Sequence, residues 1–169
     1  MCEDESICGV YPYFQNAIYS RLTTNNNIRT PPKSDVFLAI QDPYVQQIVT
    51  GSKTYELWKY HLEEYIERIW FYRTVPYSIV KYICEILPAK TRNPGDLPLK
   101  ENGLGNEEFN TKHEDWEGYD FAYRFLSVYK LDKPITLNDL MNEHGMEGAP
   151  RGFVYTPGPI MELVDWHKQ

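Results

Sequence analysis

Short runs of apolar residues, separated by polar breaks, recur along most of the chain and predict more strands than helices. The runs expected to form strands cover 35–40, 66–74, 78–90, 121–131 and 151–158. They are rich in the β-branched and aromatic residues that fit a pleated surface. Because helices do not alternate regularly with these runs, a parallel doubly wound sheet is not expected.

Two other segments carry helix signals at both ends. In the first, Asp42 is placed to cap a short helix, a proline follows it, and Gly51 ends the helix. In the second, Thr136 and Asp139 have the spacing of a capping box, and Gly145 is the stop. Together the elements predict an α+β fold that is mainly β, namely a small, mostly antiparallel β-barrel with short flanking helices.

The beginning of the chain is less regular than the rest. Residues 1–34 include a polar run that breaks at two consecutive prolines, so we expect a partly ordered N-terminal arm there. Residues 35–169 are expected to form one domain. A chain of 169 residues is long enough for such a domain to be stable without disulfides or a metal.

The charge balance limits the kinds of nucleic-acid binding that are plausible. The chain has 17 Lys and Arg against 24 Asp and Glu, which gives a net charge of -7. Broad binding to phosphates needs clustered basic residues, so coating of DNA or RNA is disfavoured. A small pocket that reads one base or nucleoside remains compatible with this charge.

Cysteine and histidine are too few and too scattered to predict a metal site. Cys84 lies in an apolar run and is expected to be a buried small hydrophobic residue, whereas Cys2 and Cys8 lie in the arm. The four histidines form no i,i+4 pair and have no cysteine pair nearby. We therefore expect no metal and no cofactor.

The sequence also lacks the signals of a membrane protein. No apolar run reaches the roughly 18 residues of a membrane span, and no apolar signal region follows the acidic N-terminus. We expect an intracellular protein, cytoplasmic or nuclear, without a membrane partner.

The segment 50–60 fits neither a helix pattern nor a strand pattern, because charged and aromatic residues mix irregularly in it. We interpret it as a helix end, a turn and the start of a strand. On a regular strand Glu56 and Trp58 share one face, so Lys53 reaches Glu56 only if Lys53 belongs to the turn. The simpler interpretation is a solvated Lys53 near a helix C-terminus, with Glu56 in an ion pair with Lys59 or Arg151.

Several stretches, taken in order, resemble the ASCH domain of the PUA-like superfamily. They run from the first strand through the segment G-S-K-T-Y-E-L-W, then through "RTVPYS", and end at "APRGFVY". The similar stretches are 36–59, 69–86, 116–131, 133–137 and 148–155, so the resemblance covers about residues 35–156. Their order and spacing carry more weight than any one of them.

The resemblance implies a small β-barrel with a cleft beside the helix-to-strand turn. Relatives in this superfamily bind RNA or modified bases there, and some ASCH proteins are nucleases or amidohydrolases that remove an acyl group from modified cytidine. Lys53 matches the catalytic lysine of the amidohydrolases, but Glu56 stands where they have threonine. Trp58 stands where the related K-x-x-E subgroup usually has arginine. The exchange at Glu56 favours binding over catalysis.

The same motifs supply the candidate ligand-binding residues. A carboxylate at Glu56 can accept from an amine or N–H of a base, while Trp58 or Tyr72 stacks on the base. Thr74 can donate a hydroxyl hydrogen bond or simply end its strand, and Phe153 can stack or belong to the core. Arg151 can bind a phosphate through its fork of donors. The full set is Lys53, Glu56, Trp58, Lys59, Tyr72, Thr74, Arg151 and Phe153.

Three functions remain open from the sequence. The first is a non-catalytic module that binds RNA, in particular a single strand, or a nucleoside with a modified base. The second is a small hydrolase acting on a modified nucleoside or on RNA, with Lys53 and Glu56 as the catalytic residues. The third is a protein-interaction module whose partner contacts the tyrosine-rich surface or the N-terminal arm.

Overall fold

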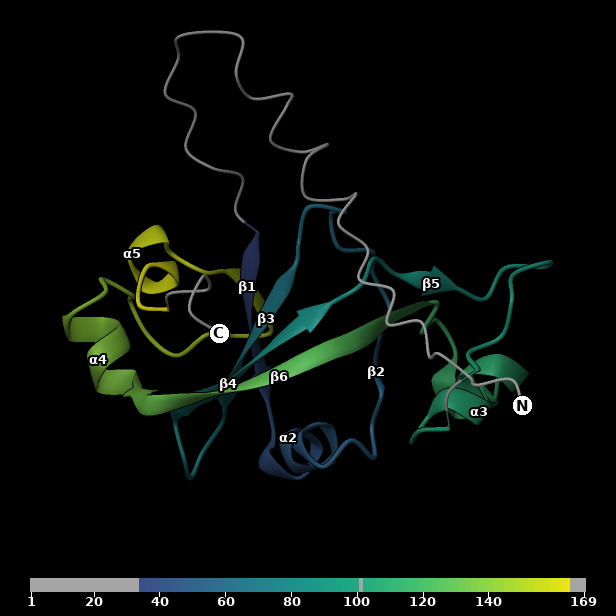
Figure 1. The fold of residues 1–169 in the computed structure, drawn as a ribbon, viewed down its shortest axis with the longest axis horizontal. Helices are drawn as coiled ribbons and strands as arrows, with labels where there is room; N and C mark the ends of the chain where they lie inside the picture. The colour runs from purple at the N-terminus through teal and green to yellow at the C-terminus, as the bar shows by residue number, and fades with distance from the viewer. Residues whose placement is uncertain (1–33, 101, 165–169) are drawn as a thin grey trace, which may run out of the picture. The chain divides into compact units, whose positions relative to one another are not determined.

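A computed structural model describes residues 34–100 and 102–164. The expected N-terminal arm, residues 1–34, lies outside the described residues except for Ser34. The helices and strands are β1 Asp35–Ile40, α2 Asp42–Val49, β2 Tyr55–Trp58, β3 Arg68–Arg73, β4 Ile79–Ile86, β5 Lys90–Thr91, α3 Asn106–Thr111, a 3-10 turn Glu114–Trp116, β6 Phe121–Thr136, α4 Leu137–Asn142, β7 Phe153–Tyr155 and α5 Gly158–Met161 (Figure 1).

The strands form one mixed sheet in the order β2-β6-β4-β3-β1-β7, and β5 pairs with the beginning of β6. Only β1 and β3 are parallel, and the remaining pairs are antiparallel. The two end strands, β2 and β7, approach each other through side chains, since the rings of Trp58 and Phe153 are 6.0 Å apart. The sheet is therefore a curled half-barrel with short helices, and the predicted α+β, mainly β fold class is confirmed.

The first strand and helix form as their local sequence predicts, with one difference. Gly51 adopts a positive φ of 76° directly after α2, and its N–H donates to the carbonyl of Ile48 at 3.0 Å. The N-cap, however, is Gln41 rather than the predicted Asp42. The Asp42 carboxylate forms an ion pair with Arg73 at the end of β3 instead. The Asp42 carboxylate is therefore engaged by Arg73 and does not cap the helix.

Alternation along the strands divides the core between the two faces of the sheet. In β3, Ile69 and Phe71 pack on the face that α2 covers, whereas Trp70 and Tyr72 pack on the opposite face. Leu140 of α4 and Ile160 of α5 belong to that opposite cluster. Figure 1 shows the corresponding arrangement, with α2 on one side of the strands and with α4 and α5 away from it. Residues next to each other in a strand therefore reach different environments.

The middle of the chain differs most from the sequence prediction. The run 78–90 is split into β4 and β5, and β6 extends five residues beyond the predicted end at Leu131. Helix α3 and the 3-10 turn lie where a long polar segment gave no helix signal. Asn110 of α3 holds the preceding segment by bonding both the N–H and the carbonyl of Leu99, at 2.8 and 3.0 Å. None of the described helices is long and apolar enough to span a membrane.

A buried polar network joins the starts of β1 and β3. Asp35 is fully buried, and its carboxylate accepts hydrogen bonds from Nε and Nη2 of Arg68 at 2.7–3.0 Å. The same carboxylate accepts from Nε1 of Trp70 at 2.7 Å and from the hydroxyl of Ser34 at 2.7 Å. A buried charge is tolerated only when its partners are this complete. The network joins Asp35 to Arg68, its partner in the register of the parallel β1–β3 pair.

We predict that Asp35→Ala lowers the free energy of unfolding by about 3–5 kcal/mol, because it leaves the Arg68 guanidinium partly buried without its carboxylate. Denaturant titration followed by circular dichroism measures the change. The control is Asp132→Ala at an exposed position of β6, which should stay within about 0.5 kcal/mol of the parent protein. Equal effects of the two substitutions would contradict the role of the network.

Candidate functional site

Lys53 and Glu56 converge because the chain turns between α2 and β2. After Gly51 ends the helix, the N–H of Lys53 donates to the carbonyl of Gln47 at 2.9 Å, which holds Lys53 against the helix. Glu56 is the second residue of β2, and its side chain points to the face that α2 covers. Lys53 thus belongs to the turn. This position lets its side chain reach Glu56, as expected from the sequence.

The two side chains form an ion pair that is largely removed from solvent. Lys53 Nζ lies 3.1 Å from Oε1 and 3.0 Å from Oε2 of Glu56, and each side chain is only 11% exposed. Nζ donates a hydrogen bond to Oε1. No group among the described residues donates a well-oriented hydrogen bond to Oε2, which is fully buried. Oε2 is therefore in ionic contact with Nζ, and its second lone pair can accept a further hydrogen bond.

The electrostatics of the site are set by this carboxylate. Burial raises the pKa of Glu56, and the charge and hydrogen bond of Lys53 offset part of that increase. Burial raises the pKa of Tyr60 and that of Cys84, and the Glu56 carboxylate raises both further. The Glu56 carboxylate therefore acts on both Tyr60 and Cys84.

A group of aromatic rings lies where β2 and β7 approach each other, around Trp58, two residues after Glu56 in β2. The ring of Tyr60 stacks on Trp58, with centroids 5.5 Å apart and planes 28° from parallel. Tyr123 and Phe153 also contact Trp58, at 5.3 and 6.0 Å, and Phe153 contacts Tyr155 at 5.6 Å. We call Trp58, Tyr60, Tyr123, Phe153 and Tyr155 the aromatic cluster. Trp58 is buried, whereas Tyr60 is 48% exposed.

Only some of the predicted site residues lie together. Lys53, Glu56, Trp58 and Phe153 are on the face of the sheet that α2 covers, next to or within the aromatic cluster. The ion-pair partner of Glu56 is Lys53, and neither Lys59 nor Arg151 takes that role.

The other predicted residues lie elsewhere. Tyr72 is buried in the cluster on the opposite face, and Lys59 extends over the ring of Tyr119, with Nζ 4.8 Å from its centroid. Thr74 follows β3, where its N–H donates to the carbonyl of Ile40 at 3.0 Å. Arg151 is exposed, just before Gly152, which has a positive φ of 64°. A base held at Glu56 would not contact Tyr72 or Lys59.

The sequence analysis missed several residues that shape the site. Tyr44 of α2 lies beside Lys53, whose Nζ is 5.6 Å from its ring centroid. The Tyr123 hydroxyl accepts a hydrogen bond from the N–H of Leu62 at 2.6 Å, which holds the segment after β2 on the cluster. The apolar stripe of α2 contains Tyr44, and Tyr60 follows Trp58 at a spacing of two. Both signals were therefore present, but they do not indicate a site by themselves.

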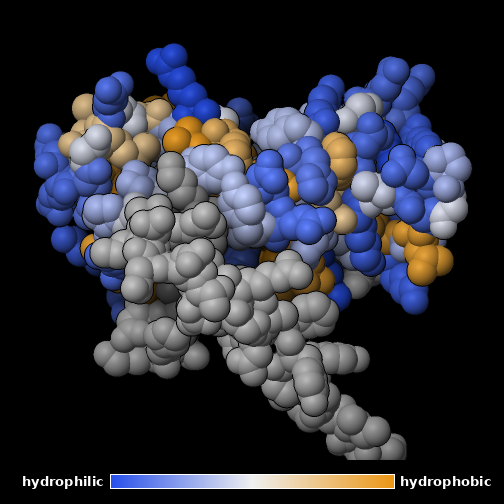
Figure 2. All heavy atoms as spheres, turned by 90° about the horizontal axis from the view of Figure 1, so that it is seen from above, coloured by the Kyte–Doolittle hydropathy of each residue, from blue (hydrophilic) through white to orange (hydrophobic). Residues whose placement is uncertain are grey.

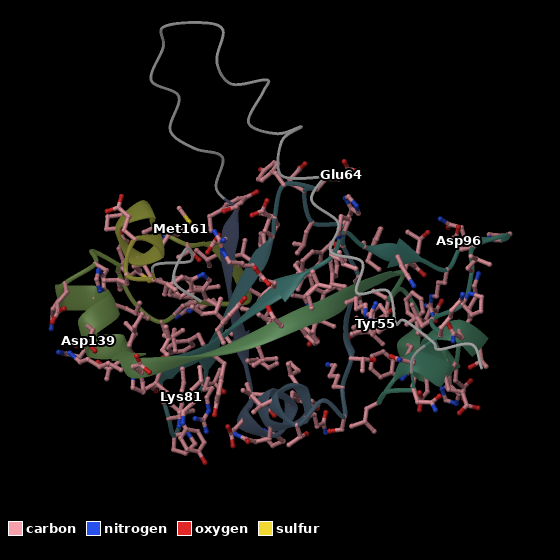
Figure 3. The ribbon with its side chains drawn as sticks, viewed as in Figure 1. Tyr55, Glu64, Lys81, Asp96, Asp139 and Met161 are labelled. Carbon is pink, nitrogen blue, oxygen red and sulfur yellow. The ribbon has the colours of Figure 1, made fainter. Side chains whose placement is uncertain are left out.

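Two surface hollows lie away from the ion pair. One is lined by β6, α4 and residues near Leu163, and includes Asp139, which Figure 3 places at the α4 end of the domain. The other is lined by β5 and the segment around Asp96. Neither is lined by Lys53 or Glu56. In residues 34–100 and 102–164, no group of three or more His, Cys, Asp or Glu side chains is placed to hold a metal ion.

Comparison with solved structures identifies the fold. The ASCH protein from Zymomonas mobilis matches with a TM-score of 0.55 and 17% identity, over 77% of this chain and 92% of that chain. A tyrosine-to-phenylalanine mutant of that protein matches with a TM-score of 0.56 and 16% identity, over 77% of this chain and 95% of that chain. A serine-to-alanine mutant matches with a TM-score of 0.52 and 19% identity, over 80% of this chain and 100% of that chain. The described domain thus has the ASCH fold, as the resemblance predicted.

Comparisons of sequence gave no further match. No protein-family model matches the chain, and no curated protein matches it.

The raised pKa of Glu56 predicts a specific pH dependence of stability. Since the folded-state pKa lies above the ordinary value of 4.5, the folded protein binds this proton more tightly than the unfolded chain. The contribution is fully present at low pH and is lost as pH rises from about 4.5 through the folded-state pKa. Glu56→Gln should therefore become progressively more stable relative to the parent protein as pH rises through this window.

Denaturant unfolding of the parent protein and of Glu56→Gln, from about pH 4 to about pH 8, measures this difference. A difference in unfolding free energy that stays constant over the whole range would show that the pKa of Glu56 is not raised by folding.

Proposed function

We propose that the domain is a non-catalytic module that binds a nucleobase, carried by single-stranded RNA or by a nucleoside with a modified base. The observation that carries this proposal is the buried Glu56 carboxylate, which is paired with Lys53, lies next to the aromatic cluster and can accept a further hydrogen bond at Oε2. Buried polar atoms are normally satisfied, so a bound water or a donor group of a ligand would complete the hydrogen bonding of this oxygen.

The chemistry around Glu56 suits a flat heterocycle with hydrogen-bonding edges. Oε2 can accept from an exocyclic amine or a ring N–H, and Lys53 can donate to a carbonyl oxygen or ring nitrogen. Tyr60 and Phe153 offer ring surfaces on which a base can stack. Because Oε2 is fully buried, a base edge can reach it only after side chains beside it move.

The geometry favours binding over hydrolysis. Lys53 is already engaged with both oxygens of Glu56, so it is not positioned as an unpaired base. Cys84 is the only cysteine among the described residues, and burial and the Glu56 charge raise its pKa, so it stays protonated and is a poor nucleophile. Hydrolysis of a modified nucleoside or RNA is the alternative function. A protein partner bound through the N-terminal arm, residues 1–34, also stays a prediction.

We predict that a panel of nucleosides and short single-stranded RNAs contains a ligand whose affinity falls at least about tenfold in Lys53→Ala, because a charge-assisted hydrogen bond is lost. Isothermal titration calorimetry measures the affinities. Lys130→Ala, which removes an exposed lysine of β6, is the control and should bind as the parent protein does. Circular dichroism shows whether each variant is folded.

Loss of binding in Lys53→Ala alone supports the proposal, whereas no measurable affinity for any ligand of the panel refutes it. Mass spectrometry of acylated cytidine and RNA after incubation with the parent protein tests the alternative. Product that forms with the parent protein and disappears in Lys53→Ala would replace the binding module with a hydrolase.

A further inference from the structure

The ring of Tyr60 is half exposed beside the ion pair and the aromatic cluster. One of its faces is stacked on Trp58, and the ring edge of Phe153 lies 6.4 Å from its centroid. The side chain is nevertheless 48% exposed. A ring fixed from one side and open on the other is a platform on which a planar ligand can stack, and its π-face attracts positive charge.

The segment that follows Tyr60 is acidic. Residues 60–67 contain Glu63, Glu64 and Glu67, all exposed, and contain no lysine or arginine. Buried Leu62 and Ile66 anchor the segment in the same core cluster as Trp58. Figure 3 places Glu64 at the upper side of the domain, and the described residues seen from above in Figure 2 are mainly hydrophilic. The acidic segment is therefore held on the core cluster that contains Trp58, on which Tyr60 stacks.

Two titration shifts agree with this charge distribution. The Glu56 carboxylate contributes to the raised pKa of Tyr60, after burial. The pKa of Tyr65 is raised to about 12, mainly by its hydrogen bond with Tyr155, with a smaller contribution from the charge of Glu63. In both tyrosines a nearby glutamate is one of the smaller causes of the raised pKa.

We propose that the site selects a positively charged heteroaromatic ring, such as a base made cationic by N-methylation, over its neutral counterpart. The ring stacks on the open face of Tyr60, its N–H edge is directed toward Oε2 of Glu56, and the Glu63 and Glu64 carboxylates favour its charge. This inference rests on the proposed binding of a base at the same site. The exposed Arg151 is the group that an anionic ligand would use instead.

Two isomeric nucleosides test the inference directly. 1-Methyladenosine is a cation near neutral pH, whereas N6-methyladenosine carries the same methyl group and is neutral. We expect the parent protein to bind 1-methyladenosine about tenfold more tightly by calorimetry, and to bind its 5′-monophosphate more weakly than the nucleoside.

Variants show whether the preference comes from the named groups. Tyr60→Phe should keep the preference because the ring remains, and Tyr60→Leu should abolish it. Glu63→Gln combined with Glu64→Gln should reduce it about threefold. The matched control is Glu107→Gln combined with Glu108→Gln, which removes two exposed adjacent acids of α3 and should leave the preference unchanged.

The outcomes separate this inference from the proposed function. If both nucleosides bind but N6-methyladenosine or the monophosphate binds equally well or better, the preference for a cation is wrong and base binding stands. If neither nucleoside nor any RNA binds, the proposed function fails and this inference fails with it.

Discussion

The buried ion pair between Lys53 and Glu56 is the constraint on which the account of this domain depends. A carboxylate with 11% exposure is tolerated in a core only if an opposite charge comes with it, and Lys53 provides that charge from the turn before β2. The turn exists because Gly51 ends α2 with a positive φ. Local backbone chemistry at one glycine thus places a charged pair inside a curled sheet.

The curl of the sheet gives the pair its surroundings. Because β2 and β7 are at opposite ends of the strand order, Trp58 and Phe153 meet only when the sheet bends. Tyr60 then completes the contact from the segment after β2. The same bending that closes the half-barrel therefore builds the aromatic cluster next to the buried Glu56 carboxylate. The bending of the sheet thus accounts for both the half-barrel and the position of the candidate site.

Elements with local signals could be predicted from the sequence, and contacts between distant segments could not. Strand β1, helix α2 and the capping box of Thr136 with Asp139 follow from patterns within a few residues. Helix α3 was missed because its stability comes from Phe109 in the core and from Asn110 bonding Leu99. The predicted site contained Lys53 and Glu56 but also Tyr72, which strand alternation turns to the other face.

A double-mutant cycle on Lys53 and Glu56 tests the central claim most directly. The cycle compares Lys53→Met, Glu56→Gln and the double variant with the parent protein by denaturant unfolding near neutral pH. If the pair is buried as described, each single change leaves a partner uncompensated, and the double variant recovers stability, with a coupling of about 2–3 kcal/mol. Additive effects, with a coupling below about 0.5 kcal/mol, would contradict the account.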